Sequence, residues 1–140
     1  MSTFPLAGLL RLRRLKEDLA AAEVGEARSR ASRLAAERHR LIDALDDHLL
    51  PPRDVSAVAA IAAARSSAAA MLADLERLRA EQAEAVTVAE GEHRRTRQET
   101  AAVEKLEERH GERQRVLDLR AEQAVLDELA GRTPAAEGDG

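Results

Sequence analysis

The sequence has 140 residues, a formal net charge of −4 and one aromatic residue, Phe4. Because aromatic side chains dominate the energetics of globular cores, a thick core is not expected. Charges of both signs are interspersed, which disfavours a dedicated nucleic-acid binder, and the lack of cysteine excludes disulfides and thiolate chemistry. Alanine, glutamate, arginine and leucine are abundant, which favours long helices or a coiled coil.

The opening stretch, Phe4–Glu23, does not have the order of a secretory signal. Its apolar run, Leu6–Leu10, is short and precedes the basic residues, whereas a signal begins with the basic region. No segment reaches the roughly 20 apolar residues of a membrane span. The alanine-rich run Val55–Ala64 comes nearest to that length. We therefore expect a soluble, cytoplasmic protein without direct membrane insertion.

A first helix is predicted over residues 5–49. Thr3 can cap it, and Pro5 suits an early helical position because its missing N–H has no partner there. Pro51 and Pro52 cannot continue a helix, so a tight turn is expected over residues 50–54.

The apolar spacing of this first helix is that of a coiled-coil seam. Its steps alternate between three and four residues, which gives a period near 3.5. The spacing predicts an initial stripe and then, after a shift of phase, a second one. The first stripe is Leu12, Leu15, Leu19 and Ala22, and the second is Val24, Ala27, Ala31, Leu34, Arg38, Leu41 and Leu45.

A second, longer helix is predicted over residues 55–130, with Asp54 as its N-cap. Its extra length has two explanations: the helix overhangs the first one, or the Ala/Ser-rich part Val55–Ala70 makes a separate excursion. The heptad phase slips near Gly111. Residues 133–140 are small, polar and acidic, and we expect them to be disordered.

Together these elements predict an all-α protein, with two long helices folded as an antiparallel coiled-coil hairpin in one domain, residues 1–132. No Gly-rich phosphate loop is present, and no two histidines have the spacing of metal ligands on a helix. A two-helix protein also offers no pocket for acyl transfer. We therefore expect no enzymatic activity, no metal and no cofactor.

The two ends of the chain resemble the flagellar export protein FliJ family. "FPLAGLLRLRRLKEDLAAAE", at the start, is similar to the family's opening, which has an aromatic, an apolar pair and a Leu-Arg-x-Arg-rich turn before an alanine-rich helix. "VEKLEERHGERQRVLDLRAEQAVLDELAGR", Val103 to Arg132, resembles its C-terminal segment. The matching residues there are Glu104, Lys105, Leu106, Glu122, Asp127 and Glu128.

The resemblance implies an antiparallel coiled coil similar to the central stalk of rotary ATPases. Such a stalk would enter the ring of the FliI-type export ATPase, promote its assembly, and contact the FlhA-type export gate protein and export chaperones. Its place would be peripheral, at the cytoplasmic face of the cell membrane, and the chain would be a monomer on its own. The alternative is a generic homodimeric coiled-coil scaffold, or the equivalent stalk of a virulence-type secretion system.

The basic cluster near the start has three interpretations: ordinary helix charge, a protein-docking site, or attachment to a membrane surface. If the ends pair, the leucines would face the C-terminal helix and the basic residues would face a partner. The acidic residues would lie on the other strand of the paired ends. The candidate protein-binding residues are Leu10, Arg11, Arg13, Arg14, Lys16, Glu122, Asp127 and Glu128.

Overall fold

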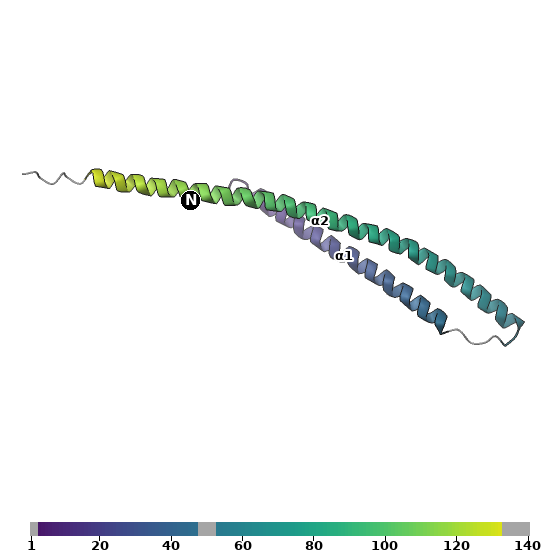
Figure 1. Ribbon diagram of the computed structural model, residues 1–140. Coiled ribbons are helices and arrows are strands. Elements are labelled where there is room, and N and C mark those ends of the chain that lie inside the picture. Colours follow the sequence, from purple (N-terminus) through teal and green to yellow (C-terminus); the bar gives the residue numbers. More distant parts are fainter. Residues whose placement is uncertain (1–2, 48–52, 133–140) are drawn as a thin grey trace, which may run out of the picture. The chain divides into compact units, whose positions relative to one another are not determined.

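The computed structural model describes residues 3–47 and 53–132, which are 94% helical and contain no strand. Helix α1 spans Ala7–Asp46 and helix α2 spans Val55–Gly131, and the two pack against each other (Figure 1). The predicted fold, two long paired helices, is confirmed. The Pro51-Pro52 pair within the predicted turn and the predicted disordered tail, 133–140, lie outside the described residues.

The helix ends follow local backbone chemistry. Asp54 Oδ1 accepts a hydrogen bond from the Ala57 N–H at 2.6 Å, so the predicted N-cap of α2 is confirmed. Helix α1 begins only at Ala7, whose N–H donates to the Phe4 carbonyl at 3.1 Å. The prediction that Thr3 caps this helix is therefore wrong, because Thr3 precedes the first helical residue by more than a turn.

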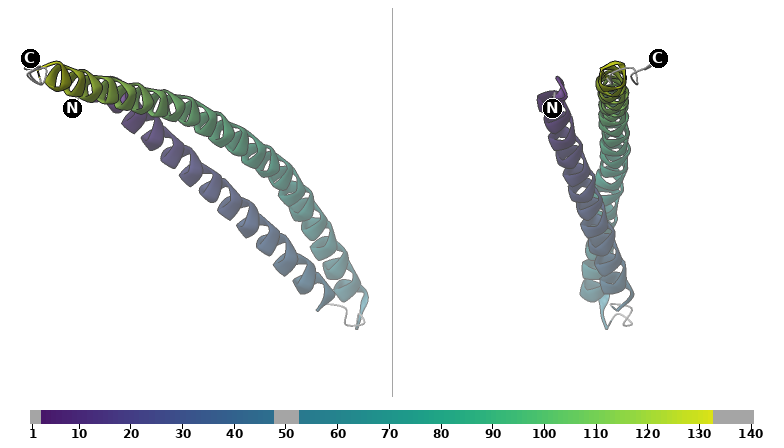
Figure 2. Two further views of the ribbon diagram at one scale, coloured as in Figure 1. Left: turned by 60° about the vertical axis from the view of Figure 1, so that its left-hand side comes forward. Right: turned by 90° about the vertical axis from the view of Figure 1, so that its left-hand side faces the viewer.

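The described residues form two compact units, each of which combines a part of α1 with a part of α2. One unit, which we call the end unit, contains residues 1–15 and 97–140. The other, the middle unit, contains residues 16–96. In the middle unit Arg28 contacts Glu90 and Arg38 contacts Glu76, so the two helices run in opposite directions, as Figures 1 and 2 show.

Small side chains bring the helices together in the middle unit. Val24, Ala27 and Ala89 form a buried cluster, and the partly buried Val86 packs against it. Ala27 is 1% exposed. Its carbonyl also accepts a hydrogen bond from Gln82 Nε2 at 3.2 Å, a contact that joins the helices beside the alanines. Close backbone approach therefore replaces the large apolar side chains of an ordinary core.

The buried side of α1 keeps one phase along its length. Its seam positions are Leu10, Arg13, Glu17, Ala20, Val24, Ala27, Ala31, Leu34, Arg38, Leu41 and Leu45, which are buried or half-buried. The later predicted stripe, from Val24 to Leu45, is confirmed. The first predicted stripe is wrong, since Leu12, Leu15 and Leu19 are exposed.

Helix α2 is continuous from Val55 to Gly131, and passes through Gly91 and Gly111 without any glycine at positive φ among the described residues. Its Ala/Ser-rich beginning therefore makes no separate excursion. In the end unit the ring of Phe4, which precedes α1, lies beside the ring of His110 of α2, with the centroids 5.5 Å apart. Beyond these rings α2 continues as an overhang. Of the two explanations for its extra length, the overhang is therefore the one that is confirmed.

Ion pairs reinforce the thin seam of the middle unit. Arg28 Nη2 lies 2.8 Å from Glu90 Oε1, and the Arg38 side chain bonds to the Glu76 carboxylate. The hydrogen bond from Arg38, helped by the charge of Arg79, lowers the pKa of Glu76 below its ordinary value of 4.5. Within α2, a hydrogen bond from Arg95 likewise lowers the pKa of Glu92. Only the lowered pKa of Glu76 reflects a contact between the two helices.

Replacing Ala27 by leucine is expected to destabilise the pair by about 1–3 kcal/mol, because overpacking forces the two backbones apart. It also disturbs the bond between the Ala27 carbonyl and Gln82. Urea unfolding followed by circular dichroism measures the change. Ala35→Leu is the matched control on the exposed side of α1, and its effect should stay within ~0.5 kcal/mol. Equal losses for both variants would contradict the seam described here.

The Glu76 contact predicts a specific pH dependence. Because the folded pKa of Glu76 lies below its ordinary value of 4.5, its stabilising contribution is present above that value and is lost as the pH falls through the folded pKa. The melting temperature of the unmodified protein should therefore exceed that of Glu76→Gln at pH 7, and the difference should shrink towards pH 3.

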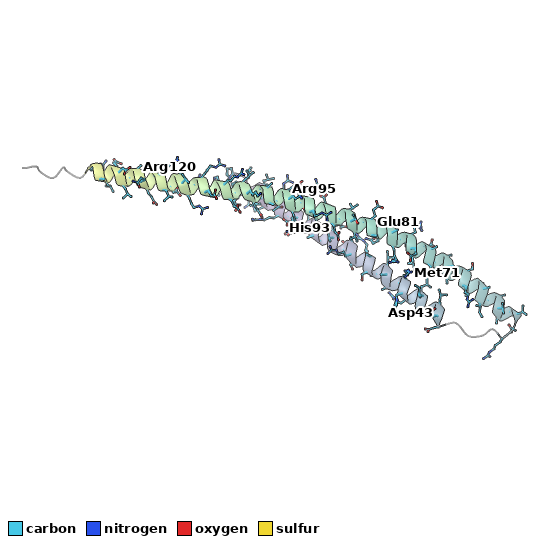
Figure 3. The ribbon with its side chains drawn as sticks, in the orientation of Figure 1. Asp43, Met71, Glu81, His93, Arg95 and Arg120 are labelled. Carbon is cyan, nitrogen blue, oxygen red and sulfur yellow. The ribbon has the colours of Figure 1, made fainter. Side chains whose placement is uncertain are left out.

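Glu81→Gln provides the control, since Glu81 is exposed on the same helix (Figure 3). Within the described residues it makes no ion pair. Its difference in melting temperature from the unmodified protein should be small and vary little with pH. A Glu76→Gln difference that stays constant from pH 7 to pH 3 would show that the Arg38 contact does not stabilise the pair.

Candidate protein-binding surface

Leu10 is not a surface residue. It is 2% exposed and belongs to the seam of the end unit, where Thr100 and Val103 of α2 are also buried. The prediction that Leu10 binds a partner is therefore not supported, because its side chain is not accessible. Its contribution is to the pairing of α1 with α2, because burying a leucine side chain contributes about 1.5–3 kcal/mol.

Arg13 also lies at the seam, and the expectation that it faces outward is wrong. Its side chain is 31% exposed, and its Nη1 donates to Glu99 Oε2 at 2.7 Å. Its carbonyl accepts a hydrogen bond from the Thr100 hydroxyl at 3.3 Å. A long arginine stem can cover apolar surface while the guanidinium reaches the edge of the seam. Arg13 therefore has a structural role in the helix pair, and its side chain is not freely available to a partner.

The remaining basic residues of the cluster are exposed, as predicted. Arg14 Nη2 lies 3.6 Å from Glu104 Oε1, a longer and more exposed pair than that of Arg13. Arg11 and Lys16 make no ion pair with any residue in the two described ranges. Within the basic cluster, Arg11 is consequently the cation of the end unit that a partner can reach without breaking an ion pair of the described residues.

Glu122, Asp127 and Glu128 are exposed on the overhang of α2. Gln123 Nε2 donates to Asp127 Oδ1 at 3.0 Å, and Arg132 Nη2 lies 2.7 Å from Glu128 Oε1. These acids lie on α2, the other strand of the end unit, but they do not lie across from Arg13 and Arg14. Arg13 and Arg14 instead meet glutamates near the start of the end unit's α2 segment, because the register of the hairpin places the acidic group beyond the first residues of α1.

Sequence reasoning missed two features of this surface. Glu99 and Glu104, which pair with the arginines, were not identified as partners. Leu12 and Leu15 were assigned to the seam but are exposed in the end unit. The unbroken spacing of three and four residues from Leu10 to Val24 was the signal that could have placed the leucines outside.

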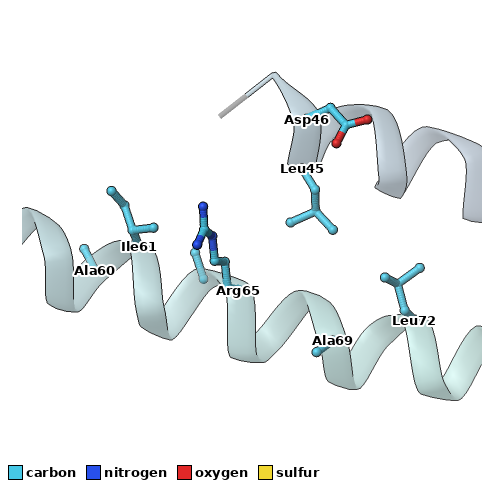
Figure 4. A pocket seen from close by; sticks show the side chains of 8 residues that line it. Leu45, Asp46, Ala60, Ile61, Arg65, Ala69 and Leu72 are labelled. Carbon is cyan, nitrogen blue, oxygen red and sulfur yellow. The ribbon is translucent and has the colours of Figure 1, made fainter. Parts of the chain in front are cut away.

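A shallow apolar recess lies in the middle unit, between the last residues of α1 and the first turns of α2. Leu45 points from α1 towards α2, and Leu72 points from α2 towards α1 (Figure 4). Asp46 and Arg65 supply its charged groups. The lining residues are Leu45, Asp46, Ala60, Ile61, Ala64, Arg65, Ala69 and Leu72. This lining contains no histidine or cysteine, and its single carboxylate and guanidinium form no acid–base constellation.

Residues 3–47 and 53–132 contain no group of three or more His, Cys, Asp or Glu side chains that could hold a metal ion. Helix α2 does contain an 18-residue window with a mean hydropathy of 1.5, of which 6% is buried. By length and composition alone this window could cross a membrane, which the sequence analysis did not anticipate. Core helices and leader sequences meet the same criterion, so the window alone does not locate the protein.

The Arg13–Glu99 pair should show measurable coupling. A double-mutant cycle with Arg13→Met and Glu99→Gln is expected to give about 0.5–1 kcal/mol at low salt, since both side chains are about two-thirds buried. The more exposed Arg14–Glu104 pair, treated in the same way, should give less. Urea unfolding of the four variants in each cycle supplies the values. Larger coupling for Arg14–Glu104 would contradict this ranking.

The surface of the end unit thus combines the exposed Arg11, the outward-facing Leu12 and Leu15, and the overhang of α2, which carries charges of both signs. The resemblance of the two chain ends to a known family stays a prediction. Comparisons with protein-family models, with curated proteins and with solved structures find no match to this chain.

Proposed function

We propose that this chain is a non-enzymatic component of the flagellar type III protein export apparatus, a coiled-coil stalk that binds the export ATPase and promotes assembly of its ring. One observation carries the proposal. Residues 1–15 and 97–140, which hold most of the two segments that resemble the FliJ family, belong to the same unit. A stalk that presents both segments to one partner requires this proximity.

The physical properties of the end unit suit such a role. Its exposed side chains carry both signs of charge, and exposed ion pairs contribute only about 0–1 kcal/mol each. A partner ring can therefore hold the helices through several weak contacts that exchange readily. The export gate and the export chaperones would be further partners, and the protein would act at the cytoplasmic face of the cell membrane.

Arg11 is the residue most suited to contact the ATPase. It is exposed, it belongs to the end unit, and it makes no ion pair within the described residues. Arg13 and Arg14 are already paired with Glu99 and Glu104, so a partner would have to compete for them. The contact therefore depends on Arg11 more than on its neighbours.

Arg11→Glu should weaken binding to the cognate ATPase about tenfold, or ~1.4 kcal/mol, and lower the stimulated rate of ATP hydrolysis. Its helicity by circular dichroism should not change, because the side chain lies outside the seam. Arg33→Glu is the matched control, an exposed arginine of α1 in the middle unit. Calorimetry with the purified ATPase measures both variants.

The unmodified chain should raise the ATPase rate and increase the size of the ATPase assemblies seen by light scattering. Absence of binding would overturn the proposed function. A stable dimer that forms in place of the hairpin and uses the alanine seam would then favour the scaffold alternative. Equal weakening by Arg11→Glu and Arg33→Glu would retain the function but remove Arg11 from the contact.

A further inference from the structure

The overhang of α2 carries an apolar stripe that the hairpin does not cover. Every residue from Arg115 to Arg132 is exposed. Leu119 is 64% exposed and Leu126 is 59% exposed, although both are large apolar side chains. The stripe advances by three and four residues in alternation, like the buried seam of α1. Its members are Val116, Leu119, Gln123, Leu126 and Ala130.

This stripe is not the continuation of the seam that α1 occupies. Two heptads after the buried Val103 the seam phase reaches Leu117, and Leu119 lies two residues further on. Two residues turn a helix by about 200°, so Leu119 lies on the opposite side of α2. A longer α1 would not cover it. The stripe therefore needs a separate helix as its partner.

The charges beside the stripe identify that partner. In heptad terms, with Leu119 and Leu126 at d, Arg120 and Asp127 occupy successive e positions. An antiparallel pair of identical helices brings e positions together. When Leu126 of one copy packs beside Gln123 of the other, Arg120 of each copy faces Asp127 of the other. The arrangement gives two symmetric ion pairs.

A parallel pair of the same helices has the opposite electrostatics. Parallel coiled coils bring each g position next to an e position of the following heptad. That would place Arg115 beside Arg120 and Glu122 beside Asp127, so that every flanking contact joins like charges. The charge pattern thus disfavours the parallel form and favours the antiparallel one.

We infer that the overhang, residues 116–130, is a docking surface for a second copy of this chain, paired antiparallel through the Leu119–Leu126 stripe and the Arg120–Asp127 ion pairs. The hairpin seam is completed within one chain, so the expected monomer remains the folding unit. The contact is short, and Gln123 places an amide within it, so association is reversible and depends on concentration. This inference goes beyond the proposed function and does not depend on it.

A charge-swap series read by sedimentation equilibrium tests the inference. The unmodified protein should show a monomer–dimer equilibrium as its concentration rises. Arg120→Asp and Asp127→Arg should each weaken the dimer at least tenfold, because each creates two like-charge contacts. The double variant with both changes should restore the dimer. Each substitution lies on an exposed surface, so the hairpin should remain folded by circular dichroism.

Asp118→Arg is the matched control, since it makes the same charge change as Asp127→Arg at an exposed position two residues after Val116 and off the stripe. It should leave the dimer unchanged. A protein that stays monomeric at every concentration would overturn the inference. Failure of the double variant to restore the dimer would overturn it as well, as would equal weakening by Asp118→Arg.

Cross-linking decides the orientation independently, because the chain has no cysteine of its own. Leu119→Cys mixed with Ala130→Cys should give a disulfide between the two different variants. Cross-links of Leu119→Cys with itself would instead show a parallel pair and contradict the inference. None of these variants changes Arg11, so loss of the dimer and loss of ATPase binding can be told apart.

Discussion

The close approach of two helices over alanine is the constraint on which the rest of this structure depends. Val24, Ala27 and Ala89 are buried where the backbones meet, and Leu10 is the only leucine of the described residues that is buried. An alanine methyl buries little area, so each contact contributes far less than a leucine would. Stability must therefore accumulate along the pair, with help from contacts such as Arg38–Glu76. That distribution explains how the hairpin tolerates polar residues in its seam.

The sequence was sufficient to predict two long antiparallel helices, the Asp54 cap and the Val24–Leu45 seam. The sequence pattern was misleading in the leucine-rich start of α1. Leu12 and Leu15 have the spacing of a seam, but a paired helix cannot change phase without disturbing its partner, so the phase of Val24 continues back to Leu10. Arg13 is then carried into the seam, where Glu99 compensates its charge. The hydrophobicity of the residues alone does not reveal that the seam keeps one phase.

The candidate binding residues were predicted less well than the fold, because their roles depend on register. The sequence contains basic residues near one end and acidic residues near the other, which would lie on the two strands of the pair if the ends pair. In the structure Arg13 and Arg14 pair with Glu99 and Glu104, and α2 carries Glu122 and Asp127 further on. The register follows from where α2 begins relative to the end of α1. Spacing within either helix does not contain that information.

The exposed leucines of the overhang, Leu119 and Leu126, can be interpreted once the seam is known. A hairpin that satisfies its own seam has no need of Leu119 and Leu126, and exposing them to water opposes solubility. The flanking charges are ordered so that they attract in one orientation of a second copy and repel in the other, which random surface charge would not favour. Arg11 belongs to the part of the end unit where α1 and α2 are paired, whereas the stripe belongs to the overhang. One chain can therefore present the proposed ATPase contact and the inferred self-contact on different residues, and a partner that covers the overhang would displace the second copy without competing for Arg11.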